Sequence, residues 1–339
     1  MKILASLSLI SLLVLGGCSS NKSDSTTSTT TPVTQNQIVH LIQPSDIPNY
    51  ITQFKQLRDQ LQLEFDGVTY PISLVDFDIQ DKVIYAKYEL GLALIGFDLE
   101  AEKPIETLTL LEGDTSDIEN FSNTVTRTLT GSQVQTTQDG DNIIYQATMT
   151  DEQTQGTYMA RLVFNDALIS GGNSVLEING DSANLSGSLG TNTYIQIDEL
   201  IMRNPEVRTI VLKDVDGSVN DAINMHTGRL VRNAQLTTFM PADGEAYSGG
   251  VDLYAAGYQR KYETGGKLGV HSWCCVDGKP ADQLGRNHSA HGAQLTYFRD
   301  ILGETNGPEF YFFTIEAASF ENVHVMTREE LDKYKLITD

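Results

Sequence analysis

The chain has 339 residues, of which 40% are hydrophobic, and this is enough for two domains with ordinary buried cores. Its 45 acidic and 23 basic residues give a formal net charge of −22. Nothing in the sequence offers the basic stripe that phosphate binding needs, so we expect no nucleic acid partner. The charge also disfavours an anionic membrane surface and otherwise indicates only solubility.

Residues 1–17 have the pattern of a secretory signal peptide. Lys2 precedes an apolar stretch too short to span a membrane, and this stretch ends in Leu-Gly-Gly before Cys18. The ending resembles the lipobox of bacterial lipoproteins, which implies cleavage before Cys18 and acylation of its sulfur and new amino group. The acyl chains would anchor the protein in lipid. Because Ser19 stands where an inner-membrane retention signal carries Asp, we expect the outer membrane, facing the periplasm. An ordinary signal peptide that contains a cysteine is the alternative.

The next two segments predict a tether and a first domain. Residues 18–37 are rich in Ser and Thr and almost devoid of apolar side chains, which is typical of a flexible tether. From 38 to 166, one helical stretch within 41–61 precedes several stretches in which apolar and polar residues alternate. These strand-like stretches are 68–79, 82–99, 142–149 and 156–164. We expect a small β-rich or α+β domain over 38–166, whose function is not readable.

From residue 167 to 339 the pattern changes to strands that alternate with helices. We expect strands within 173–188, 208–219, 236–244 and 265–273, and helices within 194–207, 220–232, 249–257 and 325–337. Such alternation predicts parallel β-α units with right-handed crossovers. In these layers ligands gather where strand ends meet helix starts.

Four segments, in order, give this region a specific resemblance. They are V-L-K-D-V-D-G-S-V (211–219), A-Y-S-G-G-V-D-L-Y-A-A-G (246–257), K-L-G-V-H-S-W (267–273) and the closing V-M-T-R-E-E-L-D-K-Y-K-L-I (325–337). Residues 167–339 resemble the Clp-protease/crotonase superfamily, and particularly its secreted or periplasmic Clp-type serine peptidases. The resemblance implies an α/β fold with a C-terminal β-α superhelical domain.

The resemblance also implies a catalytic pair and its oxyanion donors. Ser248 would be the nucleophile and His271 its base, since serine is a poor nucleophile without an adjacent base. The main-chain N–H groups of Gly249 and of the turn at Asp216 and Gly217 would hold the oxyanion. Asp216 departs from the family, which has glycine there, and its carboxylate would disfavour an oxyanion unless it points away. The alternative for Ser248 is an ordinary helix N-cap.

A third catalytic residue is less well defined. Clp-type enzymes carry an acid before the closing helix, which orients the histidine. The position in the sequence favours Asn322, whereas charge favours Glu321. A Ser-His dyad is the remaining alternative.

Two other sites are disfavoured by their spacing. An α/β-hydrolase would need G-x-S-x-G and a late histidine, but Ala246 replaces the first glycine. A zinc site from the adjacent Cys274 and Cys275 with His288 and His291 lacks the usual cysteine spacing, so we expect no metal. The two cysteines could form a vicinal disulfide or stay as separate thiols. Trp273 could wall a cleft or pack in the core.

The sequence thus predicts a lipid-anchored envelope serine hydrolase, a peptidase that acts on peptide or protein substrates without a cofactor. The alternative is a binding or scaffold lipoprotein that kept the fold and lost turnover. A crotonase-type acyl-CoA enzyme is disfavoured because the envelope lacks that cofactor. The polar segment 276–309 could form a lid or mediate contacts in a homo-oligomer.

Overall fold

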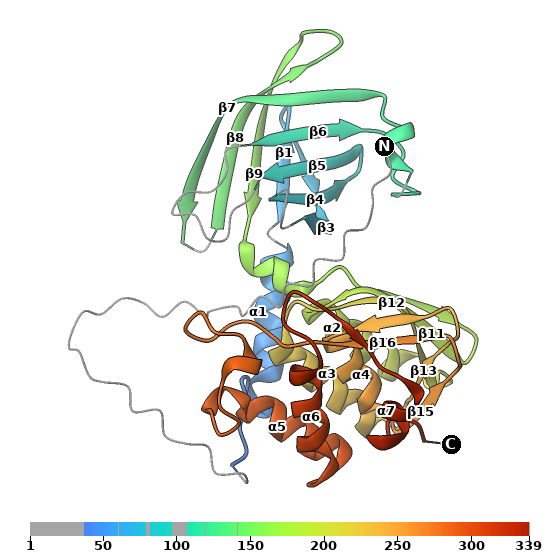
Figure 1. The fold of residues 1–339 in the computed structure, drawn as a ribbon. Coiled ribbons are helices and arrows are strands. Elements are labelled where there is room, and N and C mark those ends of the chain that lie inside the picture. Colours follow the sequence, from blue (N-terminus) through green and yellow to red (C-terminus); the bar gives the residue numbers. More distant parts are fainter. Residues whose placement is uncertain are drawn as a thin grey trace, which may run out of the picture. The chain divides into compact units, whose positions relative to one another are not determined.

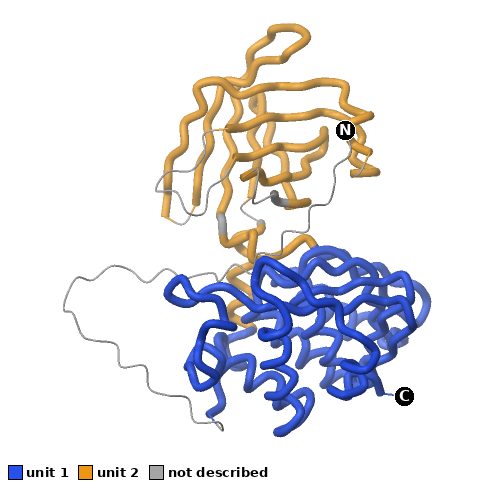
Figure 2. The backbone as a smooth tube through the Cα atoms, in the orientation of Figure 1, with its two compact units in different colours: residues 1–47, 174–339 blue, residues 48–173 orange. Residues whose placement is uncertain are grey.

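The structure of the protein is a computed structural model that describes residues 37–59, 61–78, 82–96, 107–118, 120–140 and 142–338. The chain divides into two compact units (Figure 2): residues 1–47 with 174–339 form unit 1, and residues 48–173 form unit 2. The predicted signal peptide, Cys18 and the tether up to residue 36 lie outside the described residues. The change of unit falls after residue 173, where the sequence indicated 166, and residues 38–47 go with unit 1.

Unit 2 is built on a single antiparallel sheet. Among the described residues this sheet has nine strands in the order β2-β1-β9-β8-β7-β6-β5-β4-β3, and it is strongly curved (Figure 1). The strands are β1 (Gln62–Phe65), β2 (Val68–Pro71), β3 (Ser73–Asp78), β4 (Val83–Tyr88), β5 (Gly91–Gly96), β6 (Leu108–Glu112), β7 (Arg127–Asp139), β8 (Asn142–Asp151) and β9 (Thr157–Phe164). Helix α1 (Ile47–Asp59) precedes the sheet, and short 3-10 helices lie at Phe121–Asn123 and Asp166–Gly171.

Alternating side chains give unit 2 its core. In β4, Ile84, Ala86 and Tyr88 are buried while the residues between them are partly exposed. Because side chains of a strand point alternately to opposite faces, one face of the sheet collects the apolar residues. The buried Tyr145 of β8 donates its hydroxyl to the main-chain oxygen of Gly96, at 2.7 Å. The β-rich character predicted for this part of the chain is confirmed.

Unit 1 is a mixed α/β fold, as the sequence predicted. Among the described residues its eight-stranded sheet runs in the order β10-β11-β12-β14-β16-β17, and β13 pairs with both β12 and β15. The strands are β10 (Val175–Asn179), β11 (Ser182–Leu189), β12 (Thr209–Ser218), β13 (Thr237–Met240), β14 (Glu245–Tyr247), β15 (Gln259–Tyr262), β16 (Lys267–Val270) and β17 (His324–Val325). The pairs from β11 to β16 are parallel, and the two outer pairs are antiparallel.

Helices connect these strands and cover the sheet. They are α2 (Thr191–Arg203), α3 (Asp221–Asn233), α4 (Gly249–Ala256), α5 (Gly292–Leu302), α6 (Asn306–Ala317) and α7 (Arg328–Lys333), with 3-10 turns at Pro44–Asp46, Ala281–Gln283 and Ser289–His291. Helix α4 is apolar on almost every side and lies in the core, with only Asp252 outside its buried set. A helix that is hydrophobic all round is held by tertiary packing, so α4 gives the residues at its start a fixed position.

Residues 37–42 form an extended N-terminal strap on α3 and α5. Val39 donates its N–H to Thr296 Oγ1 at 2.9 Å, and its side chain fills the space beside Gly292. Farther along the strap, the main-chain oxygen of Ile42 pairs with Nε2 of the buried His226 at 2.8 Å. These contacts explain why the strap belongs to unit 1.

The segment 276–309 is more than the polar insertion that its composition indicated. It contains α5, whose Leu295, Tyr297 and Phe298 are buried in the core of unit 1. The hydroxyl of Tyr297 donates to the main-chain oxygen of Asp252 at 2.8 Å and so ties α5 to α4. The apolar residues of α5 are spread along a polar sequence, which hid the helix.

Candidate active site

Ser248 lies at a sharp turn between β14 and α4. Its backbone dihedral angles are φ 49° and ψ −121°, a conformation that a non-glycine residue rarely adopts and that is often found at functional sites. The turn is held by a hydrogen bond from Ser248 N–H to the main-chain oxygen of Gly269, at 2.8 Å. Within the described structure, the Ser248 side chain makes no capping hydrogen bond to α4. Its hydroxyl therefore does not serve as the N-cap that was the alternative.

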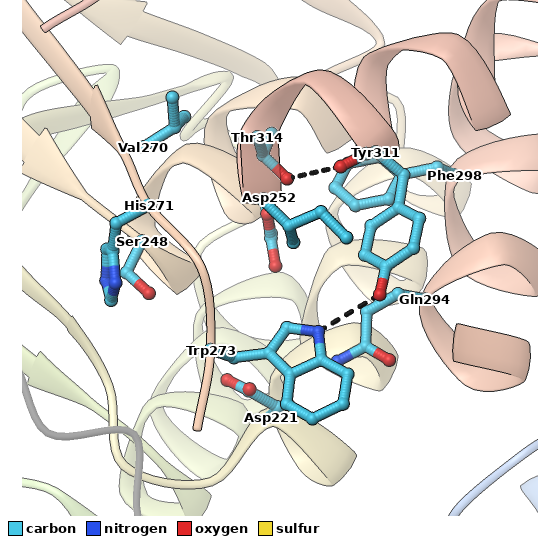
Figure 3. A pocket seen from close by; sticks show the side chains of 11 residues that line it. Asp221, Ser248, Asp252, Val270, His271, Trp273, Gln294, Phe298, Tyr311 and Thr314 are labelled. Atoms are coloured by element: carbon cyan, nitrogen blue, oxygen red, sulfur yellow. Dashed lines mark hydrogen bonds between the residues drawn. The ribbon is translucent and has the colours of Figure 1, made fainter. Parts of the chain in front are cut away.

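His271 is brought to the serine by the pairing of two parallel strands. β14 and β16 pair in register with Tyr247 opposite Gly269, and His271 directly follows β16. Ser248 directly follows β14, so both residues leave the same end of the sheet. Figure 3 shows the two side chains next to each other, and both line one pocket.

The hydrogen bonds of His271 fix its tautomer. Nδ1 lies 2.7 Å from the main-chain oxygen of Ser272, and because a carbonyl only accepts, Nδ1 must carry a proton. The side chain is 5% exposed, and burial lowers the pKa of the imidazole, an effect that the bond to Ser272 partly offsets. In the neutral ring, Nε2 then presents a lone pair. Within the described part of the chain Nε2 has no hydrogen-bond partner, Ser248 Oγ included.

The pocket beside this pair is closed by α5, α6 and the chain after β16. Its cavity volume is about 30 Å³, which is room for a group of the size of a water molecule, and it is open to solvent on one side. Its lining residues are Asp221, Ser248, Asp252, Val270, His271, Trp273, Gln294, Phe298, Tyr311, Thr314 and Ile315. Trp273 forms one wall, where its indole N–H donates to the hydroxyl of Tyr311 at 3.0 Å (Figure 3). The structure thus places Trp273 in the wall of the pocket.

Two carboxylates line the same pocket and were not singled out in the sequence. Asp252 lies one helical turn after Ser248 on α4, and Asp221 begins α3. Burial raises the pKa of Asp221 to about 6, although a hydrogen bond with Ser218 opposes this. Burial, and next the charge of Asp221, raise the pKa of Asp252 well above its usual range. Both are densely surrounded by protein, yet the pocket leaves them partly accessible. The signal available in the sequence was Asp252, the single acidic residue of the otherwise apolar helix α4.

The residues predicted to hold an oxyanion, Gly249 and the turn at Asp216 and Gly217, lie close to one another. A Cβ on Gly249 would lie 2.4 Å from Ser218 Cβ, so the start of α4 and the end of β12 touch here and only glycine fits. Gly217 has φ 136°, which also favours glycine. As the first residue of α4, Gly249 has an N–H without an intrahelical acceptor. Asp216 is exposed and accepts a hydrogen bond from Ser188 Oγ at 3.2 Å.

Neither of the predicted third residues is hydrogen-bonded to His271 in the described structure. Glu321 and Asn322 are exposed, and neither lines the pocket. The Asn322 amide donates to Ser319 Oγ at 2.8 Å instead. Ser272 O occupies the place on Nδ1 that an acid would take, so a main-chain carbonyl orients the imidazole.

The cysteines and histidines after β16 are spread out in the fold. No group of three or more His, Cys, Asp or Glu side chains in the described residues could hold a metal. His291 is buried against Tyr311, with Nδ1 2.7 Å from its hydroxyl. The sulfur atoms of Cys274 and Cys275 are in contact, and the peptide bond between them is cis.

Comparisons with known proteins place few constraints on function. No family model matches the sequence, and no curated protein matches it either. The structure is similar to an enoyl-CoA hydratase from Bacillus anthracis (12% identity, 49% of this chain and 68% of that one, TM-score 0.30). It is also similar to a crotonase-type enoyl-CoA hydratase/isomerase from Legionella pneumophila (14%, 49% and 68%, 0.30) and to DspI from Pseudomonas aeruginosa (14%, 48% and 71%, 0.32). The mixed α/β class of unit 1 rests on its strand topology, and we take no activity from these neighbours.

None of the described helices is both long and apolar enough to cross a bilayer.

Proposed function

We propose that unit 1 is a serine hydrolase in which Ser248 attacks an acyl carbonyl and His271 is its general base. One observation carries the proposal: beside Ser248, in the same pocket, His271 holds its proton on Nδ1 and leaves Nε2 buried without a partner. This is the tautomer that can take the proton of a serine hydroxyl. A hydrogen bond between the pair is absent in the described structure, but such bonds commonly tighten only when substrate binds.

The chemical steps follow from the residues around the turn. Ser248 Oγ forms a bond to the carbonyl carbon while its proton passes to His271 Nε2. The N–H groups of Gly249 and Gly217 are the donors available to the oxygen that becomes negative. His271 then gives the proton to the leaving group as its bond to the acyl carbon breaks. Water, deprotonated by His271, attacks the acyl-serine, and the bond between the acyl carbon and Ser248 Oγ breaks as the proton returns to Oγ. We further propose a peptide or protein as the substrate.

Labelling with a fluorophosphonate probe tests the hydrolase. Such probes form a bond only with an activated serine, so we expect labelling of the wild-type chain and none in Ser248→Ala or His271→Ala. Because the two side chains act as a unit, the double variant should be scarcely worse than either single variant. Ser289→Ala is the matched control, since it removes an exposed serine hydroxyl that does not line the pocket. Equal labelling with and without Ser248 would make unit 1 a binding or scaffold domain.

We also propose that the chain is anchored by acyl groups on Cys18 to the outer membrane, facing the periplasm. The support is the Leu-Gly-Gly-Cys pattern and the Ser/Thr-rich tether that follows it. Cys18→Ser should release the protein from the membrane fraction or stall its processing, whereas Cys274→Ser should leave it membrane-bound. Normal cleavage and unchanged pelleting of Cys18→Ser would overturn the anchor.

A further inference from the structure

The two carboxylates of the pocket lack a positively charged partner. Among the described residues that line the pocket, none is Lys or Arg. Burial is the largest influence on the pKa of both Asp221 and Asp252, and no cation offsets it. Keeping two carboxylates together in a poorly solvated site is unfavourable unless something positive joins them. A bound cation would supply that partner.

A second, independent feature also points to a ligand in this pocket. His271 is 5% exposed, and its Nε2 lines the pocket with no partner in the described structure. A buried nitrogen lone pair is costly when unpaired, so a donor is expected opposite it. The lining of the pocket therefore includes an imidazole and two carboxylates.

The spacing between nucleophile and carboxylates is short. Asp252 follows Ser248 by four residues, which is about 6 Å along a helix axis. Side chains of a helix lean toward its N-terminus, which directs the Asp252 carboxylate toward Ser248. Figure 3 shows this carboxylate between Ser248 and the aromatic wall. A cation held here lies very near the carbonyl that Ser248 attacks.

The walls of the pocket suit a small organic cation. Trp273, Phe298 and Tyr311 line it, and the face of an indole or a phenol attracts an ammonium group. The indole is fixed by its hydrogen bond to the Tyr311 hydroxyl, at 3.0 Å. Gln294 adds an amide whose oxygen can accept from the same group.

We propose that Asp221 and Asp252 bind the free α-ammonium group of an aminoacyl substrate, such as the N-terminal residue of a peptide. The proposal rests on the proposed function, because it places the carbonyl next to that ammonium at Ser248 Oγ. An α-ammonium sits on the carbon adjacent to the carbonyl and so matches the short spacing. The ammonium of a lysine side chain is separated from its own carbonyl by a long aliphatic stem. This stem is too long for the short separation between Ser248 and Asp252. Hydrolysis would then proceed from the N-terminus.

The preference for a substrate with a free α-ammonium group should change with pH in a defined direction. Asp221 and Asp252 must be ionised to attract the ammonium, and burial raises the pKa of Asp221 to about 6. The other titratable groups that face the pair are Tyr297 from α5, Tyr311 from α6 and His271 after β16. Burial keeps these three uncharged near neutral pH. Burial also raises the pKa of Asp252, so the preference should rise with increasing pH as both carboxyls lose their protons, and it should fall above about 8 as the α-amine loses its proton.

The experiment compares two esters that share an acyl group. Alanine 4-nitrophenyl ester has a free ammonium group, whereas N-acetylalanine 4-nitrophenyl ester has a neutral acetamide in its place. For the wild-type chain we expect kcat/KM for the free amine to be at least about tenfold higher, after subtraction of the uncatalysed rate. Asp252→Asn and Asp221→Asn should bring the ratio close to one. Asp214→Asn, which removes an exposed carboxylate of β12 outside the pocket, should keep the wild-type ratio.

The outcomes separate this proposal from the hydrolase itself. A wild-type ratio of one or below, with Ser248 still labelled by fluorophosphonate, overturns the amine site and leaves the hydrolase. If no labelling occurs, calorimetry of Ser248→Ala with alanine amide and N-acetylalanine amide decides. Binding of the free amine alone supports the site, and equal or absent binding overturns it. The wild-type comparison needs no variant, so it stands even if Asp252→Asn fails to fold.

Discussion

At the scale of single residues, the site depends on one backbone conformation and on the absence of one side chain. Ser248 keeps its φ of 49° because Gly249 lets the start of α4 press against the end of β12. Steric contact therefore sets the position of Ser248, and no hydrogen bond from its hydroxyl is required.

Gly249→Ala tests this close contact. The new Cβ would lie 2.4 Å from Ser218 Cβ and 2.9 Å from Asn224 Nδ2, so backbone must move. We expect the free energy of unfolding to fall by about 1–3 kcal/mol, measured in urea, with weaker labelling of Ser248. Gly285→Ala is the matched control, since a Cβ there meets no atom within 4 Å, and it should change stability by less than about 0.5 kcal/mol. Equal stability of both variants would contradict the packing described.

At the scale of elements, unit 1 is held at its C-terminal end by one buried cation. Arg260 of β15 is 6% exposed and donates to three main-chain oxygens. Its acceptors are Gly257 O at 3.0 Å, Lys335 O at 2.9 Å and Leu336 O at 3.2 Å. The planar guanidinium can reach all three at once, whereas an ammonium is a point donor. The segment after α7 is thereby fixed to the sheet.

Arg260→Lys should detach this segment. Each main-chain oxygen that loses its donor while still buried costs about 1–3 kcal/mol. Hydrogen exchange should accelerate in the residues around Lys335, and the unfolding temperature should fall. Lys261→Gln on the same strand removes an exposed cation and should change neither. Unaltered exchange in Arg260→Lys would show that the segment is held by its apolar contacts and by the hydrogen bonds between the Arg260 main chain and Thr338.

The elements also show what the sequence could and could not predict. Apolar runs between glycine turns predicted β12, α3 and the turn from β14 into α4, because local patterning decides each of them. The resemblance to Clp-type peptidases indicated Ser248 and His271, which the register of β14 and β16 brings together. Asp252 was hidden in an apolar run, since its role depends on which side of α4 meets the pocket. The main-chain partner of His271 could not be seen from residue types at all.

At the scale of the whole molecule, unit 2 is inserted into the sequence of unit 1. The strap at 37–42 and the sheet that begins at β10 belong to one unit, although residues 48–173 separate them in the chain. A boundary drawn from composition alone placed the strap in the wrong unit. Its local sequence is short and mostly apolar, and only its partners on α3 and α5 reveal where it belongs.

Removal of the strap should destabilise unit 1. A chain that starts at Gln43 loses the bonds to Thr296 and His226 and the apolar contact of Val39. We expect the free energy of unfolding of unit 1 to fall by about 2–4 kcal/mol from these losses together. The control starts at Gln37 and keeps the strap. Calorimetry that gives both chains the same unfolding temperature would contradict a stabilising role.

The strap also sets the order of events during protein synthesis. Val39 and its partner Thr296 are 257 positions apart in the chain. A ribosome that adds about 5–20 residues each second makes the second partner roughly 13–50 s after the first. Throughout that interval unit 2 can fold as it emerges, while the strap has no surface on which to dock. The beginning of the described chain is therefore placed only after Thr296 has been made.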